Sequence, residues 1–149
     1  MPLHESGENY LENIYILKHK LGRVRSVDLA SELNFSKPSI SRAVHILEDE
    51  GYVIFAKDGS LELTARGEEI AKTIYERHVV LTEFFMSLGV EEEQAASDAC
   101  RIEHVISGES FDKLKAHMAS CPSTCPRASQ RSHERILSEN KVHFSSQED

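Results

Sequence analysis

Two helices joined by a tight turn are expected between residues 26 and 51, and this pattern most constrains the fold. Ser26 is expected to cap the first of these helices, and the turn Asn34-Phe35-Ser36 leads into the second. Ser36 caps the second helix, and Pro38 lies in its first turn, where a missing amide hydrogen costs nothing. A stop is expected at Gly51. So short a turn makes the helices cross steeply, which projects the N-terminus of the second helix outward.

Further elements are expected on both sides of this helix pair. A helix capped by Ser6 precedes it and ends at Gly22, and two short strands follow it at residues 52–56 and 61–63. Asp58-Gly59 between the strands is typical of a hairpin turn. Later helices are expected at residues 64–88 (capped by Thr64), 91–107, 110–119 and 129–140. This order predicts a mainly α protein, with an N-terminal winged helix-turn-helix followed by an α-helical module.

The charge balance limits how the chain can bind nucleic acid. Its 149 residues carry 17 Lys and Arg against 25 Asp and Glu, a net charge of −8. This excess of acid argues against a non-specific binder, whose affinity comes from neutralising phosphates, but it leaves room for a specific binder with a local basic face. No apolar run approaches the roughly 18 to 20 residues that span a bilayer. Because the N-terminus also lacks the features of a signal peptide, a cytoplasmic protein without a membrane partner is expected.

A basic face without acidic residues occurs at the start of the third helix. The run Ser-Lys-Pro-Ser-Ile-Ser-Arg-Ala-Val-His begins at Ser36, and the first acidic residue after it is Glu48. Hydroxyls and arginine contact phosphates and base edges in a major groove, so Arg42 and Ser39 are predicted to reach base edges. The other predicted DNA-binding residues are Ser26, Ser36, Lys37 and Lys57, expected on phosphates, together with Pro38 and Ser41. For each one alone, an ordinary solvated surface residue is the alternative.

The segment Cys100-Arg101-Ile102-Glu103-His104 carries the second chemical pattern. On a helix it places Cys100, Glu103 and His104 at i, i+3 and i+4, on one face within a single turn. A thiolate, a carboxylate and an imidazole can supply half of a transition-metal coordination sphere. Taken in isolation, a packed cysteine beside a solvated Glu-His pair is the more common arrangement.

Two other segments offer ligands that would complete such a site. His78 lies in the helix expected at residues 64–88. If this helix packs against the one that carries Cys100, the His78 imidazole can face Cys100. Asn9 and Glu12 are three residues apart on one face of the first helix.

Several motifs with these residues resemble a known family. They are Glu8-Asn9-Tyr10-Leu11-Glu12-Asn13-Ile14-Tyr15, Ser36-Lys37-Pro38-Ser39-Ile40-Ser41, Leu63-Thr64-Ala65-Arg66-Gly67, Arg77-His78 and Cys100-Arg101-Ile102-Glu103-His104. In order and spacing, over residues 6–119, they resemble the metal-dependent repressors related to the diphtheria toxin repressor, and its shorter branch, the manganese transport regulators.

The resemblance implies a dimeric, metal-dependent transcriptional regulator. An N-terminal winged helix (expected at residues 1–72) would read a palindromic double-stranded operator, and a helical metal-binding and dimerisation domain (residues 73–140) would form a homodimer. The polar sequence itself predicts a disordered tail at residues 141–149. Ferrous or manganous ion would act as co-repressor at metal-uptake genes. The residues implied around the main metal site are Asn9, Glu12, His78, Cys100, Glu103 and His104. The C-terminal barrel-like domain of longer members is not expected here.

The ligand set departs from both branches of the family. Where the manganese branch has Asp and the iron branch Met, this chain has Asn9; Glu12 is the manganese-branch residue and Cys100 the iron-branch residue. Because thiolate shifts preference away from Mn²⁺, the cofactor expected is Fe²⁺, with Mn²⁺ next. Ala96 stands where some members place an ancillary-site histidine, so a second site of that kind is not expected.

The remaining cysteines and two other functions stay open. Cys121 and Cys125, with His117 and His133, would make a small zinc or redox site or an incidental loop. A metal-independent winged-helix regulator that senses an oxidant or a small molecule through its cysteines is the alternative function. An enzyme is not expected, because the chain has no Gly-rich phosphate loop and no G-x-S-x-G motif.

Overall fold

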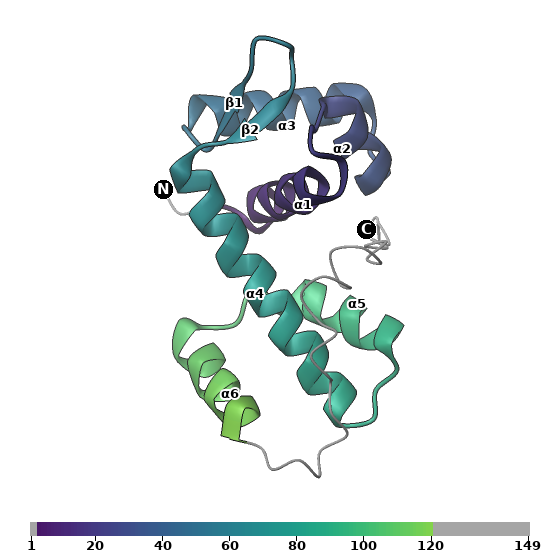
Figure 1. Cartoon of the computed structure of the whole chain (residues 1–149), viewed down its shortest axis with the longest axis vertical. Helices are drawn as coiled ribbons and strands as arrows, with labels where there is room; N and C mark the ends of the chain where they lie inside the picture. Colours follow the sequence, from purple (N-terminus) through teal and green to yellow (C-terminus); the bar gives the residue numbers. More distant parts are fainter. Residues whose placement is uncertain (1–2, 121–149) are drawn as a thin grey trace. The chain divides into compact units, whose positions relative to one another are not determined.

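The computed structural model describes residues 3–120, with helices and strands in the predicted order (Figure 1). They are α1 Glu5–Leu21, α2 Ser26–Leu33, α3 Lys37–Asp49, β1 Val53–Phe55, β2 Leu61–Leu63, α4 Ala65–Ser87, α5 Glu92–Ile102 and α6 Gly108–Ser120. Two compact units meet inside α4, where unit 1 ends at Thr73 and unit 2 begins at Ile74. The predicted fold class, mainly α with an N-terminal winged helix-turn-helix, is confirmed.

Unit 1 packs three helices and a hairpin around one hydrophobic core. In the antiparallel hairpin, Val53 lies opposite Leu63 and Phe55 opposite Leu61, and Leu61 also forms a bridge with Val24 between α1 and α2. Side chains from every element form the core, among them Leu11, Ile14, Leu29, Leu33, Ile40, Val44, Leu47, Val53 and Leu61. Since the core side of α3 carries Ile40, Val44 and Leu47, its basic side remains outside the core.

Local chemistry explains the turn between α2 and α3. Asn34 adopts a left-handed conformation with φ 56° and ψ 39°, which asparagine tolerates better than most residues. The Ser36 hydroxyl accepts a hydrogen bond from the Ser39 amide at 3.3 Å, and Pro38 lies in the first turn of α3, as predicted.

Two other predicted caps are wrong. The first helix begins at Glu5 rather than after Ser6, with His4 at the N-cap position and no side-chain cap. Ser26 is the first residue of α2 and does not cap it. The cause is Asp28, whose carboxylate accepts a hydrogen bond from the Arg25 amide at 2.9 Å and stabilises a start one residue earlier.

The hairpin tip is held by a carboxylate. Asp58 accepts hydrogen bonds from the amide (3.0 Å) and the hydroxyl (2.6 Å) of Ser60, and Gly59 takes the positive φ of 82° that the turn requires. The Arg23 guanidinium forms an ion pair with Asp58 at 3.1 Å. The predicted Asp-Gly turn is confirmed, although β1 is shorter than residues 52–56.

Unit 2 contains the rest of α4 together with α5 and α6. Its buried hydrophobic side chains include Tyr75, Ala95, Ala99 and Phe111. The prediction that α5 reaches residue 107 is wrong, because α5 ends at Ile102 and a turn follows it. The Ser107 hydroxyl accepts a hydrogen bond from the Ser110 amide at 3.1 Å, which explains why α6 begins at Gly108, earlier than predicted.

Some predictions concern residues outside the described part of the chain. These are Cys121, Cys125 and His133, the helix at residues 129–140 and the tail at residues 141–149. His117, their proposed neighbour, is an exposed residue of α6. Between residues 3 and 120, none of the helices combines the length and the apolar character needed to cross a bilayer.

Candidate metal centre and DNA-reading helix

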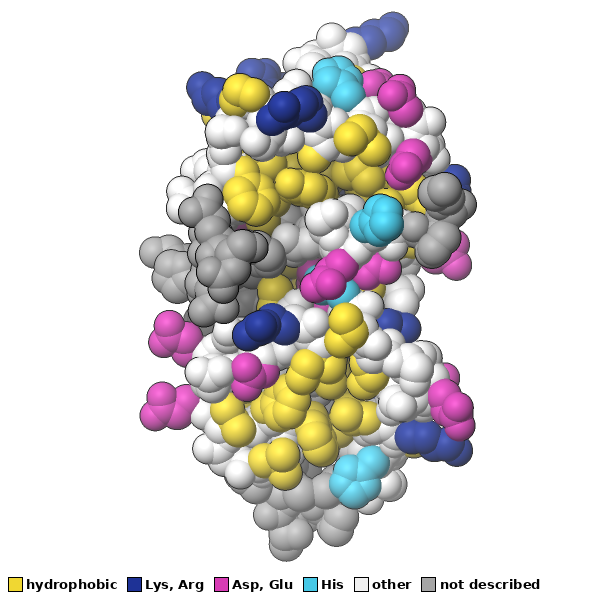
Figure 2. All heavy atoms as spheres, turned by 180° about the vertical axis from the view of Figure 1, so that it is seen from behind, with side chains coloured by type: hydrophobic (Ala, Val, Ile, Leu, Met, Phe, Trp, Pro, Cys, Tyr) yellow, Lys and Arg dark blue, Asp and Glu magenta, His cyan; other side chains and the backbone are white. Residues whose placement is uncertain are grey.

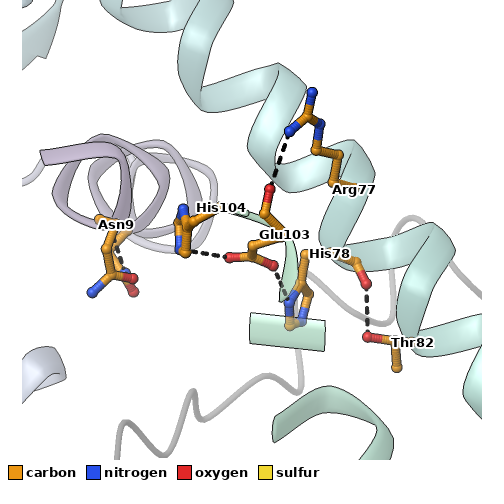
Figure 3. A network of polar contacts seen from close by, with 7 residues as sticks. Asn9, Arg77, His78, Thr82, Glu103 and His104 are labelled. Atoms are coloured by element: carbon orange, nitrogen blue, oxygen red, sulfur yellow. Dashed lines mark hydrogen bonds and ion pairs between the residues drawn. The ribbon is translucent and has the colours of Figure 1, made fainter. Parts of the chain in front are cut away.

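A fully buried carboxylate lies between two imidazoles in unit 2. One oxygen of Glu103 (Oε2) is 2.8 Å from His78 Nδ1, and the other (Oε1) is 3.3 Å from His104 Nε2 (Figure 3). The side chains of the three residues are 4% exposed or less. A buried carboxylate is costly unless polar partners or a cation compensate it. The structure therefore brings together three of the six predicted metal ligands within one unit.

Two elements position this group. His78 lies on α4, and its carbonyl accepts a hydrogen bond from the Thr82 hydroxyl at 2.7 Å. Glu103 follows the last residue of α5, keeps helical dihedral angles (φ −55°, ψ −28°), and donates its amide hydrogen to Ala99 at 2.9 Å. His104 lies in the turn after it. The expected single helical face is thus corrected: the Glu-His pair lies at the end of α5 and not inside the helix.

The donor set fits a divalent transition metal. His78 and His104 offer borderline nitrogen donors, and Glu103 offers hard oxygen donors. Cys100 is half-buried on α5, one turn before Glu103, and adds a soft donor to the same segment. Each carboxylate oxygen of Glu103 faces an imidazole nitrogen, so atoms that could ligate an ion already lie close together.

Asn9 and Glu12 are buried polar residues of unit 1. They lie three residues apart on α1 and are 5% and 3% exposed. Asn13 donates from its amide nitrogen to the Asn9 backbone carbonyl at 2.8 Å and to Asn9 Oδ1 at 3.1 Å. An amide oxygen has two lone pairs, so Asn9 Oδ1 keeps one for another partner. Sequence reasoning missed Asn13, although its spacing of four residues from Asn9 could have indicated this contact.

The predicted DNA-reading residues of α3 lie side by side at its N-terminal end. Lys37, Pro38 and Arg42 are exposed, whereas Ser39 and Ser41 are half-buried. The exposed Ser36 hydroxyl donates to Ser39 Oγ at 2.8 Å, so both hydroxyls also serve the helix cap.

Two predicted contacts come from other elements of unit 1. Ser26 is half-buried at the start of α2, and Lys57 is exposed in the hairpin turn. His45 is exposed on α3. Its ring packs against Phe55 with the centroids 5.4 Å apart, and it forms an ion pair with Glu48 at 3.4 Å.

Exposed hydrophobic side chains gather on one side of unit 2. Figure 2 shows this collection over the part of the molecule that contains the end of α4 together with α5 and α6. Among large hydrophobic residues of this unit, Leu88 is 66% exposed and Val105 is 70% exposed. Contiguous apolar surface of this kind is typical of a surface for protein association.

Family models match both parts of the chain. Residues 2–61 match the model described as iron dependent repressor, N-terminal DNA binding domain, and residues 64–132 match iron dependent repressor, metal binding and dimerisation domain. Two similar curated proteins are both described as HTH-type transcriptional regulator MntR. The protein from Lysinibacillus sphaericus (strain C3-41) is 35% identical over 109 residues, 73% of this chain and 78% of the relative. The protein from Bacillus subtilis (strain 168) is 36% identical over 109 residues, which are 73% of this chain and 77% of the relative.

Solved structures agree with this fold. The manganese regulator SloR aligns with a TM-score of 0.69 at 26% identity, over 85% of this chain and 58% of that chain. The metal-dependent transcriptional regulator MtsR aligns with a TM-score of 0.71 at 22% identity, over 80% of this chain and 56% of that chain. At this identity the alignment shows a likeness of fold. This chain therefore spans less than two thirds of either structure.

The two MntR proteins are regulators of transcription and not enzymes. With both family models matched in order along the chain, it belongs to the metal-dependent transcriptional repressors of the diphtheria toxin repressor and manganese transport regulator family.

Proposed function

We propose that this chain is a cytoplasmic, homodimeric repressor that binds a palindromic double-stranded operator when loaded with Fe²⁺ or Mn²⁺, and that it represses metal-uptake genes. The observation that carries the proposal is the buried Glu103 carboxylate between His78 and His104, in the unit matched by the metal-binding and dimerisation model. The exposed hydrophobic side chains of the same unit support the homodimer.

In this proposal His78, Glu103 and His104 would hold the metal, together with Cys100 from α5 and Asn9 and Glu12 from α1. When bound, the ion would supply positive charge that compensates buried carboxylates. The case for the α1 residues rests on their burial, their common face and the family resemblance. A cation stabilises a buried carboxylate, so a bound ion would stabilise Glu12.

The preference between Fe²⁺ and Mn²⁺ rests on Cys100. Its thiolate favours Fe²⁺ over Mn²⁺, whereas carboxylates such as Glu12 and Glu103 suit Mn²⁺. The similarity to MntR proteins and to the manganese regulator SloR gives the iron preference no support. We therefore keep both ions in the proposal and assign the ranking to the thiolate.

Coupling to DNA follows from what α1 contacts. Leu11 and Ile14 of α1 belong to the same core as Ile40 and Val44 of α3. Holding α1 through Asn9 and Glu12 would therefore restrain the reading helix, and in a dimer it would restrain the spacing of the two reading helices. Operator half-sites have a fixed spacing, so a dimer with that spacing preorganised binds more tightly.

The DNA contacts proposed are those of the exposed end of α3 and its neighbours. Arg42 and Ser39 would reach base edges. The remaining contacts would be Ser26, Ser36, Lys37, Pro38, Ser41 and Lys57. Loss of a base-edge contact at Arg42 would relax the sequence preference at one operator position. Loss of a phosphate contact at Lys37 would weaken binding to all DNA sequences alike.

The test is operator affinity with and without metal, using a duplex selected in vitro with the Mn²⁺-loaded full chain. We expect Mn²⁺ or anaerobic Fe²⁺ to tighten binding by about 5-fold to 150-fold, the usual range of allosteric coupling. Glu103→Ala should abolish this gain. The matched control is Glu109→Ala, an exposed carboxylate on α6, which should keep it. Equal affinities with and without metal in the wild type would contradict the proposal.

A further inference from the structure

Arg77 contacts the backbone of the turn that carries the proposed metal ligands. Its Nη1 donates a hydrogen bond to the carbonyl of Glu103 at 3.2 Å (Figure 3). The same atom donates to the carbonyl of Ile106 at 3.1 Å. The guanidinium carbon also lies 5.7 Å from the centre of the Phe111 ring, which comes from α6. A single side chain of α4 thus joins the turn after α5 and the start of α6.

This turn ends a helix without the usual glycine. A helix leaves its last carbonyls without intrahelical partners, and a residue with positive φ commonly lets the backbone satisfy them. Gly22 ends α1 in that way, with φ 74°. None of residues 103–107, all of which the structure describes, has a positive φ. The carbonyl of Ile102, the last residue of α5, accepts from the Val105 and Ile106 amides at 3.0 Å. Arg77 supplies partners for two carbonyls that follow the helix, those of Glu103 and Ile106.

Arg77 and His78 together hold the same residue in two ways. Arg77 binds the Glu103 backbone carbonyl, and the next residue, His78, binds the Glu103 carboxylate at 2.8 Å. Glu103 and His104 are consecutive residues. By holding the Glu103 backbone, Arg77 therefore also restrains the backbone from which the His104 side chain extends. The buried Arg77 Nε has no hydrogen-bond partner among residues 3–120, so the side chain is kept at this position despite a desolvation cost.

We propose that Arg77 is a positioning residue of the metal centre, which fixes the turn at residues 103–106 so that Glu103 and His104 are presented together. The inference rests on the proposed metal binding. Partners that orient metal ligands typically change metal affinity by 10-fold to 100-fold when they are removed.

The test compares Arg77→Met with Arg101→Met in the full chain. Both variants lose one positive charge near Glu103, but Arg101 is exposed on α5. We expect Arg77→Met to weaken Mn²⁺ and Co²⁺ binding, measured by calorimetry, by about 10-fold to 100-fold. Arg101→Met should bind like the wild type. Equal affinities of the two variants would overturn the proposal.

Two further readouts separate positioning from fold stability. At saturating Co²⁺, Arg77→Met should show a d–d absorption spectrum different from the wild type, because displaced ligands change the ligand field, whereas Arg101→Met should match it. An unchanged spectrum in Arg77→Met would count against positioning. If Arg77→Met does not fold, Arg77→Lys replaces it: lysine keeps the charge on a shorter side chain. Metal affinity of Arg77→Lys equal to that of Arg101→Lys would also overturn the proposal.

Hydrogen exchange of the metal-free protein tests the turn independently of metal. The Val105 and Ile106 amides donate to the Ile102 carbonyl at 3.0 Å, and they should exchange faster in Arg77→Met than in Arg101→Met. Equal exchange would overturn the positioning role. Failure of the wild type to bind Mn²⁺ or Co²⁺ would instead refute the proposed function, so the two failures are distinguishable.

Discussion

Cys100 is the soft donor among the proposed ligands, beside the carboxylates of Glu12 and Glu103 and the imidazoles of His78 and His104. A thiolate lowers the relative affinity of a site for Mn²⁺ and raises it for Fe²⁺, Co²⁺ and Zn²⁺. Cys100 is half-buried on α5, one turn before Glu103, so it is the proposed ligand at which a substitution tests metal choice.

Cys100→Asp should therefore shift the metal ranking toward Mn²⁺, because a carboxylate replaces the thiolate. Competition between Mn²⁺ and Co²⁺ measured by calorimetry on the full chain checks this expectation. Cys100→Ser is the control, since it removes the thiolate without adding a carboxylate. An unchanged ranking in both variants would show that Cys100 does not set selectivity.

The sequence singled out His78, Glu103 and His104, which the structure brings together, but it did not single out Arg77 or Asn13 as residues that contact the candidate ligands. His78 and Glu103 are 25 positions apart, so only the family resemblance, and not helical spacing, could pair them in advance. Arg77 acts on carbonyls 26 and 29 positions away, a contact that no local pattern reveals. Asn13 was missed because its partner, Asn9, was considered only as a metal ligand.

The first turn of α4 packs so closely against the backbone just before β1 that no side chain fits at Gly67. A Cβ added there would lie 2.1 Å from the Tyr52 carbonyl oxygen. The Gly67 amide also donates to the Thr64 hydroxyl at 3.1 Å, which confirms the predicted Thr64 cap of α4.

Gly67→Ala should therefore destabilise unit 1, by at least the roughly 1–3 kcal/mol typical of overpacking. Urea denaturation of the full chain, followed by circular dichroism, measures this loss. Gly108→Ala is a matched control, because a Cβ there meets nothing within 4 Å. The control should be neutral or more stable by about 0.4–1 kcal/mol, since alanine restricts the unfolded chain. Equal destabilisation of both variants would contradict the packing described for Gly67.

The hairpin should show a pH dependence that comes from Asp58. Hydrogen bonds from the Ser60 hydroxyl and amide, helped by the charge of Arg23, hold the pKa of Asp58 below its ordinary value. A carboxyl with a lowered pKa stabilises the folded state above its unfolded pKa of about 3.9, and this stabilisation is lost as the pH falls through the folded-state pKa. Asp58→Asn should thus lower the melting temperature at pH 7, and the difference from the wild type should shrink by pH 3. A difference of the same size at both pH values would contradict this assignment.

The helices and the hairpin were predictable because strong local chemistry marks their ends. Gly22, Ser36 and Asp58-Gly59 each act within a few residues, and the structure confirms them. The errors arose where two local caps competed, as Asp28 did with Ser26, or where a distant side chain intervened, as at the end of α5.

We propose that residues 1–72 read DNA and that residues 73–140 bind metal and dimerise. The two family models follow the same order along the chain. Metal and DNA would then be coupled through α1, whose ligands Asn9 and Glu12 lie on a helix that shares its core with the reading helix. Thermodynamic linkage requires such coupling to act equally in both directions.

Coupling between metal and DNA is tested by the Mn²⁺ affinity of the full chain, measured by calorimetry with and without saturating operator duplex. We expect the duplex to tighten Mn²⁺ binding by the same factor by which Mn²⁺ tightens operator binding, about 5-fold to 150-fold. A Mn²⁺ dissociation constant unchanged by the duplex would contradict this coupling.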